Sequence, residues 1–151
     1  NRGNVYNLFK QIYNNSFLMI GSGNNKKSMA YVGNLASFIN KRMIHQAGHE
    51  IFNYADKPDL SMNELVYLCE RKLNTRIPKV RIPYLLGIIG SSVIDFIFLV
   101  FGKKSPINPL RIKKFCATTQ FNSSKAFETD FKAPFTIKNS IANTIQNEFK
   151  S

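Results

Sequence analysis

A glycine-flanked turn followed by basic residues is the part of the sequence best suited to binding a phosphate-bearing ligand. Residues 21–25 read Gly-Ser-Gly-Asn-Asn, and Lys26, Lys27 and Ser28 follow. Backbone N–H groups of such a turn, together with lysine ammonium groups, can meet a diphosphate. The glycine spacing is not that of a Walker loop, and no Gly-Lys-Ser/Thr follows. An ordinary hairpin turn is the structural alternative.

Two other spacings imitate catalytic or metal motifs. Tyr6 and Lys10 have the Y-x-x-x-K spacing of a dehydrogenase pair, in which the tyrosine donates a proton. No cofactor-binding unit precedes Tyr6 in the sequence, so we interpret the pair as a chance match. His45 and His49 are spaced i, i+4 like zinc ligands on a helix, but the glutamate of a metalloprotease motif is missing. We therefore predict no catalytic, cofactor-binding or metal-binding residue in these 151 residues.

The charge balance indicates an anionic partner or a lysine-rich composition. The chain carries 21 Lys and Arg against 9 Asp and Glu, a net charge of +12. Phosphate-bearing ligands, nucleic acid and anionic membranes all suit such a charge. The basic pairs are scattered, however, and no RNP-like octamer is present. We therefore predict no nucleic-acid partner, and a nucleic-acid-binding module is a hypothesis that only the charge favours.

The cysteines and the first residues of the chain give an indication of the cellular compartment. The two cysteines, Cys69 and Cys116, form no C-x-x-C and predict neither a disulfide framework nor a zinc site. No signal peptide can be read at the polar start of the chain, which also lacks an initiating Met. These features predict a cytoplasmic protein, with membrane association left open, and suggest a fragment or a processed chain.

Hydrophobic spacing predicts short strands that alternate with helices, an α/β arrangement. Ser61 and Glu64 form a predicted capping box, and Asn34 and Thr136 are predicted N-caps. The predicted helices cover residues 4–14, 34–48, 62–73, 84–101, 124–127 and 136–149. The predicted strands or extended pieces cover residues 17–20, 28–32, 51–54, 79–82 and 116–121.

The strongest apolar segment is residues 84–101. Its length approaches the roughly 20 residues of a membrane span. Asp95 argues against spanning, because an acid in mid-helix costs about 2.5–3.5 kcal/mol on insertion scales. We predict that this helix is mostly buried, in a core or at an interface. The functional alternative is a helix resting on a membrane surface, helped by Lys103 and Lys104.

Three stretches, in order, share the pattern of one enzyme family. Residues 20–36 run as a glycine turn, a basic strand and a Gly-Asn-Leu-Ala helix start. Residues 51–65 run as an Ile-Phe-Asn-Tyr strand and a Ser-Met-Asn-Glu helix start. Residues 121–149 run as a Ser-Ser-Lys-Ala passage, a proline and a final helix. Together they resemble the extended short-chain dehydrogenase/reductase family of sugar-nucleotide epimerases, reductases and dehydratases.

The resemblance implies the C-terminal, substrate-binding fragment of a Rossmann-type enzyme whose cofactor domain is absent. Residues 1–47 would form the edge of the Rossmann portion with the substrate turn, and residues 48–151 the C-terminal small domain. The full-length enzyme would use NAD or NADP through a Tyr/Lys pair upstream, and this fragment would bind no cofactor and be inactive. Its partners would be the missing Rossmann domain and a UDP-sugar used in surface polysaccharide synthesis, with a homodimer and a membrane contact through 84–101 left open.

The same resemblance assigns substrate-binding residues. Lys27 stands where many family members carry an arginine that meets the nucleotide, and Ser28 follows it. Asn4 matches a region that approaches the sugar nucleotide, and Arg111, or else Lys114, would supply a second basic contact to the diphosphate. The alternative function is a small basic membrane-surface protein anchored by helix 84–101.

Overall fold

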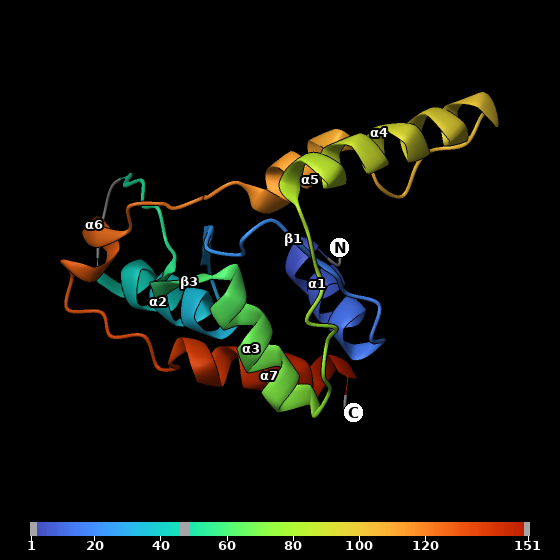
Figure 1. The fold of residues 1–151 in the computed structure, drawn as a ribbon. Helices are drawn as coiled ribbons and strands as arrows, with labels where there is room; N and C mark the ends of the chain where they lie inside the picture. The colour runs from blue at the N-terminus through green and yellow to red at the C-terminus, as the bar shows by residue number, and fades with distance from the viewer. Residues whose placement is uncertain (1–2, 46–48, 150–151) are drawn as a thin grey trace.

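The computed structural model describes residues 3–45 and 49–149 and shows a mixed α/β arrangement of short strands and helices, as predicted (Figure 1). Asn1, Arg2 and the predicted helix end at Gly48 lie outside the described residues. The elements are α1 (Asn4–Tyr13), β1 (Met19–Ile20), β2 (Lys26–Met29), α2 (Val32–His45), β3 (Asp56–Ser61), α3 (Met62–Leu73), β4 (Arg81–Ile82), α4 (Tyr84–Val100), α5 (Pro109–Cys116), α6 (Ser124–Phe127) and α7 (Ile137–Phe149).

The strands form two small sheets. β1 pairs with β4 in parallel, with Met19 opposite Arg81, and β2 pairs with β3 in antiparallel fashion, with Lys26 opposite Ser61. Thr119 adds a parallel bridge to Lys27, which confirms an extended chain there. Each sheet therefore joins a strand that precedes residue 47 to one that follows it, and the division of the chain at residue 47 stays a prediction.

The main core lies between α1, α3 and α7, which pack side by side in Figure 1. Each of these helices turns an apolar face inward at helical spacing, as amphipathic helices do. The residues that contribute to it are Leu8, Phe9 and Ile12 from α1, Met62, Leu65, Val66, Cys69 and Leu73 from α3, and Ile137, Ile141 and Ile145 from α7. This core holds the two sheets in place, because Phe17, Met19 and Leu60 belong to it as well.

The capping box predicted at the start of α3 is present. The Ser61 hydroxyl accepts from the Glu64 backbone N–H at 3.2 Å, and the Ser61 N–H donates to the Glu64 carboxylate at 2.8 Å. These reciprocal bonds satisfy donors that a helix start leaves unpaired. The backbone hydrogen bond from Ser61 is the main reason that the pKa of Glu64 is lowered.

The strand predicted at residues 51–54 is wrong. Phe52 and Tyr54 instead pack with Phe38 of α2 in a second, aromatic cluster that also holds Phe131. The strand is β3, five residues later, where the backbone of Asp56–Ser61 pairs with β2. Phe52 and Tyr54 are half-buried while Ile51 is exposed, and packing of aromatic side chains does not require backbone pairing.

Asn34 is not the N-cap that the sequence predicts. α2 begins at Val32, and Leu35 N–H already bonds to the Tyr31 carbonyl. The Asn34 amide is fully buried, donates to Asp56 and to the Phe135 carbonyl at 2.9 Å each, and accepts from the Phe135 N–H. The residue therefore ties α2 to β3 and to the segment before α7.

One helix was not predicted at all, namely α5. Asn108 caps it by accepting from the Arg111 N–H at 2.9 Å, and Pro109 occupies the first turn. A side-chain oxygen at the cap and a proline just inside are usual at a helix start. The eight residues carry a short, basic sequence, and the two prolines nearby favoured a loop.

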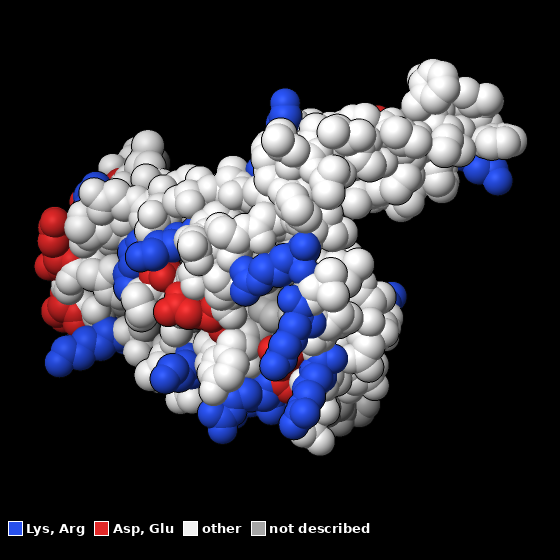
Figure 2. Space-filling view, in the orientation of Figure 1, with Lys and Arg blue, Asp and Glu red and all other residues white. Residues whose placement is uncertain are grey.

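α4 forms where the sequence predicts a helix. The core of the described chain does not bury it, and burial at an interface stays a prediction. It projects from the body with α5 and the returning chain beside it (Figure 1), and Ser91 is the one residue of α4 that the fold buries. The space-filling view shows this projection almost wholly white, with Lys or Arg near its two ends (Figure 2). No other element of the described chain covers its apolar outer side. None of the helices in the described ranges is long and apolar enough to span a membrane.

Candidate functional site

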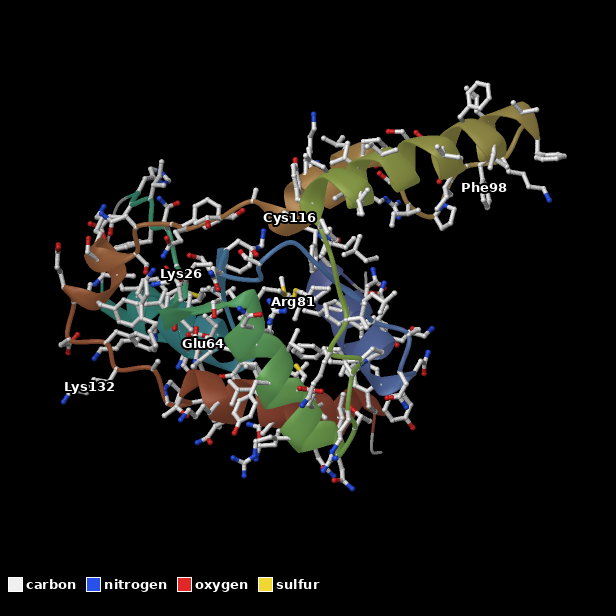
Figure 3. The ribbon with its side chains drawn as sticks, in the orientation of Figure 1. Lys26, Glu64, Arg81, Phe98, Cys116 and Lys132 are labelled. Atoms are coloured by element: carbon white, nitrogen blue, oxygen red, sulfur yellow. The ribbon has the colours of Figure 1, made fainter. Side chains whose placement is uncertain are left out.

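The glycine turn lines one side of a cavity at the root of α4. The cavity has a volume of about 370 Å³. Its lining residues are Ile20, Gly21, Ser22 and Asn25 from the turn, Tyr84 from α4, and Lys113, Cys116 and Ala117 from the end of α5. Figure 3 shows Cys116 at this root and Phe98 on the far half of α4. The fold thus brings the turn and the basic segment around residue 111 to one place.

The turn has a fixed shape. Gly21 and Gly23 have φ values of +76° and +72°, which glycine adopts without strain. A Cβ on Gly23 would lie 2.2 Å from the Asn63 side-chain oxygen, so the close packing of α3 also requires glycine there. The Gly21 N–H donates to the Ile82 carbonyl, and the Asn25 amide donates to the Phe115 carbonyl at 2.8 Å. These bonds attach the turn to β4 and to α5.

Lys27 reaches the C-terminal end of α5. Its ammonium group donates to the carbonyls of Lys114 and Ala117, at 2.9 Å and 2.5 Å. A cation there compensates the negative end of the helix dipole. Burial lowers the pKa of Lys27, and the nearby Cys116 opposes that shift. Contact between Lys27 and a diphosphate stays a prediction, and the observed role of Lys27 is to hold α5 against the turn.

Ser28 fixes β2 to two other segments. Its hydroxyl donates to Asp59 at 2.8 Å and accepts from the Phe121 N–H at 2.9 Å. Burial acts to raise the pKa of Asp59, but hydrogen bonds from Lys57, Gln120 and Ser28 outweigh it and hold that pKa below its usual value. Ser28 therefore holds β2 against Asp59 and Phe121, and its contact with substrate stays a prediction.

The two remaining predicted residues lie on exposed parts of the fold. Asn4 is the first residue of α1, and the Arg111 guanidinium donates to the Pro106 carbonyl at 2.7 Å. The basic residue of α5 that lines the cavity is Lys113, which the sequence reasoning did not choose. The basic run around Arg111 in the sequence includes Lys113. The sequence does not show that this run is helical, so the basic side chain that faces the turn could not be predicted.

A second cavity, which the sequence reasoning missed, lies beside α3 and β4. It has a volume of about 610 Å³ and is lined by Arg76, Lys79 and Arg81, together with Tyr67 and Glu70. Figure 2 shows Lys and Arg gathered on the face that carries Arg81, which Figure 3 labels. In the sequence, the signal for this cavity was the occurrence of three cations within the six residues 76–81.

Arg81 links the two cavities. It lines the second one and its guanidinium donates to the carbonyl of Ser22, which lines the first. The combined surface presents Lys79, Arg81 and Lys113 and can therefore attract phosphate-bearing ligands.

Tyr6, half of the imitated catalytic pair, stacks on Phe149 with ring centroids 5.4 Å apart, a packing contact. His49 is exposed, and the side chain of His45 lies outside the described residues. Within the described ranges no three His, Cys, Asp or Glu residues gather as a metal site would need.

Two known proteins are similar to this chain in sequence. No family model matches the chain. The chain is 49% identical over 150 residues, 99% of its length, to N-acetyl-alpha-D-glucosaminyl-diphospho-ditrans,octacis-undecaprenol 4-epimerase of Escherichia coli O157:H7. It spans 45%, about half, of that relative. A stretch of 60 residues, 39% of the chain and 17% of the relative, is 41% identical to the uncharacterized protein y4nL of Sinorhizobium fredii.

A solved structure shares the fold. The crystal structure of gox2253 matches 92% of this chain and 41% of its own with a TM-score of 0.63, at 11% sequence identity. At that identity the likeness concerns the fold alone. It shows that this arrangement of short strands and helices also occurs as part of a larger chain.

Proposed function

We propose that this chain is the substrate-binding part of an NAD(P)-dependent epimerase that acts on a sugar attached to a lipid through a diphosphate. The observation that carries the proposal is the identity of 49% along 99% of the chain to the E. coli 4-epimerase. The extended short-chain dehydrogenase/reductase pattern of the sequence supports the same class. The product would serve surface polysaccharide synthesis.

The proposed substrate differs from the UDP-sugar that the sequence analysis expects. The name of the E. coli relative places the sugar on diphospho-undecaprenol, a lipid carrier, and not on UDP. A diphosphate is common to both ligands, so the basic cavities suit either. The lipid carrier has no nucleotide for Lys27 to meet, so a contact of Lys27 would be with the diphosphate, and its ammonium would have to leave the carbonyls of Lys114 and Ala117.

The residues of the first cavity would bind and orient the substrate. The Lys113 ammonium would pair with the diphosphate, and the Tyr84 hydroxyl would offer a further hydrogen bond beside it. The fixed turn would give this pocket its shape. Asn4, Ser28 and Arg111 remain proposed contacts from the sequence pattern.

We do not place a dinucleotide at the glycine turn, because two of its backbone N–H groups already have partners. The Gly21 N–H is used by Ile82, and the Asn24 N–H faces the Ser22 hydroxyl at 3.3 Å. We place NAD(P) in another part of the enzyme, where it would accept and return a hydride at the sugar. The contribution of this chain is to hold the sugar diphosphate against that part.

A chimaera tests the proposal. The 150 matching residues of the E. coli enzyme are replaced by this chain, and conversion of N-acetylglucosaminyl-diphospho-undecaprenol is measured. We expect turnover within about tenfold of the parent, since 49% identity preserves the fold and most contacts. A chimaera that melts cooperatively yet shows no turnover would rule the proposal out.

A pair of lysine variants locates the pocket within that chimaera. Lys113→Ala removes the cavity cation, and we expect KM to rise about tenfold as one charge-assisted contact is lost. Lys138→Ala removes an exposed lysine of α7 and serves as the matched control, with KM unchanged. Equal effects of the two variants would place the diphosphate elsewhere.

The second candidate function, a membrane-surface protein without catalysis, is favoured by the exposed apolar side of α4. The chimaera separates the two, because a purely membrane-binding role predicts no turnover.

A further inference from the structure

The outer side of α4 carries large apolar side chains with no protein cover in the described chain. Leu85 is 71% exposed, Phe96 is 66% exposed and Phe101, just past the helix, is 73% exposed. Exposed apolar residues of this size in one contiguous helix mark an interaction surface. The exposed members are Tyr84, Leu85, Leu86, Ile89, Val93, Ile94, Phe96, Ile97, Leu99, Val100 and Phe101.

The polarity of α4 is the reverse of that of a helix on the surface of a water-soluble body. At 100° per residue, Gly87, Ser91, Asp95 and Phe98 fall on one side, and these residues are buried or half-buried. α5 packs against α4, so the polar Ser91 and the acidic Asp95 face the protein. The opposite side carries the stripe Leu85, Ile89, Val93, Phe96 and Val100, all exposed.

The hydroxyl groups in the middle of α4 are paired within the helix. The hydroxyls of Ser91 and Ser92 each donate to the Ile88 carbonyl at 2.9 Å. Polar groups that are paired internally are those that a lipid environment tolerates. These two serines can therefore leave water without losing their hydrogen bonds.

Cations and no acids follow α4 in the sequence. Between Asp95 and Glu128 the chain holds six Lys and Arg and no Asp or Glu. Lys103 and Lys104 lie just beyond the far end of α4, and Arg111, Lys113 and Lys114 lie on α5. An apolar stripe flanked by cations complements a membrane whose headgroups are anionic.

We propose that the projection formed by α4, its returning loop and α5 docks on an anionic lipid bilayer, with the outer stripe of α4 buried at the boundary of headgroups and acyl chains. At about 1.5 Å per residue, the 17 residues of α4 reach roughly 25 Å, short of a bilayer core of about 30 Å. α4 therefore lies within one leaflet. A second copy of this chain suits the stripe less well, because two chains of net charge +12 repel each other.

Docking goes beyond the proposed epimerase role and does not depend on it. It would also place the cavity at the root of α4, with Tyr84 and Lys113, at the level of the headgroups. The diphosphate of a lipid-linked sugar lies at that level as well. The same projection would thus bring the proposed site to its substrate.

Flotation with vesicles tests the docking of the full chain. The vesicles are phosphatidylcholine alone or phosphatidylcholine with phosphatidylglycerol. We expect the chain to float with the anionic vesicles, and the variant Ile89→Ser/Val93→Ser/Phe96→Ser to lose at least about tenfold in binding. The matched control Val32→Ser/Ile51→Ser/Val80→Ser changes three apolar residues outside the projection that are even more exposed, and it should bind as the parent does.

Two further readouts distinguish lipid from protein partners. Lys103→Gln/Lys104→Gln should weaken binding to anionic vesicles about tenfold, whereas Lys132→Gln/Lys138→Gln should have little effect. The chain contains no Trp, so Phe96→Trp gives a single reporter whose emission should shift to the blue on vesicles, while that of Val80→Trp should not. Equal flotation of the stripe variant and its control would overturn the proposal. So would light scattering that shows a dimer for the parent chain and a monomer for the stripe variant.

Discussion

The body and the projection use the same kinds of apolar side chain in opposite ways. In the body, Phe9, Ile12 and Ile145 are almost completely buried between α1, α3 and α7. In the projection, Leu85 and Phe96 are largely exposed. The helices of the body alternate polar and apolar faces, whereas α4 is apolar on nearly all of its circumference. The comparison shows that an apolar helix sequence indicates a preference for apolar surroundings. Whether other parts of the protein provide those surroundings depends on the fold.

Removal of one aromatic ring from each region should produce the largest contrast. Phe9→Ala leaves a cavity in the packed core, and we expect the free energy of unfolding to fall by about 3–5 kcal/mol. Phe96→Ala removes an exposed ring and should change it by less than about 0.5 kcal/mol. Urea denaturation followed by circular dichroism measures both. Similar losses in the two variants would mean that α4 is packed against protein.

Removal of a buried polar group should have the next largest effect. Asn34→Ala leaves the N–H and carbonyl of Phe135 and the Asp56 carboxylate short of partners, at a cost of about 2–3 kcal/mol. Ser92→Ala in α4 removes a hydroxyl that bonds within its own helix and should be nearly neutral. Thermal melting of the two variants makes the comparison. An unchanged melting temperature for Asn34→Ala would show that this network does not hold the body together.

The two helix caps provide a subtler comparison. Ser61→Ala removes the capping box of α3 in the core and should cost about 1 kcal/mol of global stability. Asn108→Ala removes the cap of α5 in the projection. Its effect should be mainly local, seen as faster amide exchange in α5, because the projection contributes little to the core. Equal losses of global stability in the two variants would show that the body and the projection unfold as one cooperative unit.

The smallest predicted effect concerns pH. The Ser61 hydrogen bonds lower the pKa of Glu64 below its ordinary value of 4.5. A lowered folded-state pKa means that Glu64 stabilises the body above pH 4.5 and that this contribution disappears as pH falls through the lower value. Glu64→Gln should therefore flatten the acid limb of the stability profile. A profile identical to that of the parent would show that the carboxylate is not needed in ionised form.

Two of the three helix starts predicted from local signals are confirmed. Ser61 with Glu64 caps α3, and the Thr136 hydroxyl accepts from the Asn139 N–H at the start of α7. The third, an N-cap at Asn34, is wrong because α2 already begins at Val32. β3 was missed because its sequence, Asp-Lys-Pro-Asp-Leu-Ser, is polar and becomes a strand only by pairing with β2. α5 was missed because it is short and begins at the second of two closely spaced prolines.

The candidate site could be predicted in part. The glycine turn was identified, but the partners of Lys27 lie about ninety residues away on α5, and no local pattern reveals them. Lys113 and Arg81 acquire their places through the pairing of β1 with β4 and the packing of α5 on α4. The surroundings of α4 could not be predicted from the sequence, because hydropathy does not distinguish a protein interior from a lipid surface.

Hydrogen–deuterium exchange with and without anionic vesicles tests most directly whether the projection is made for lipid. Exchange is followed by mass spectrometry across the described helices. We predict that vesicles slow exchange in α4 and α5 at least about tenfold while α1, α3 and α7 exchange as before. Unchanged exchange in α4, or slowing confined to the body, would contradict the account.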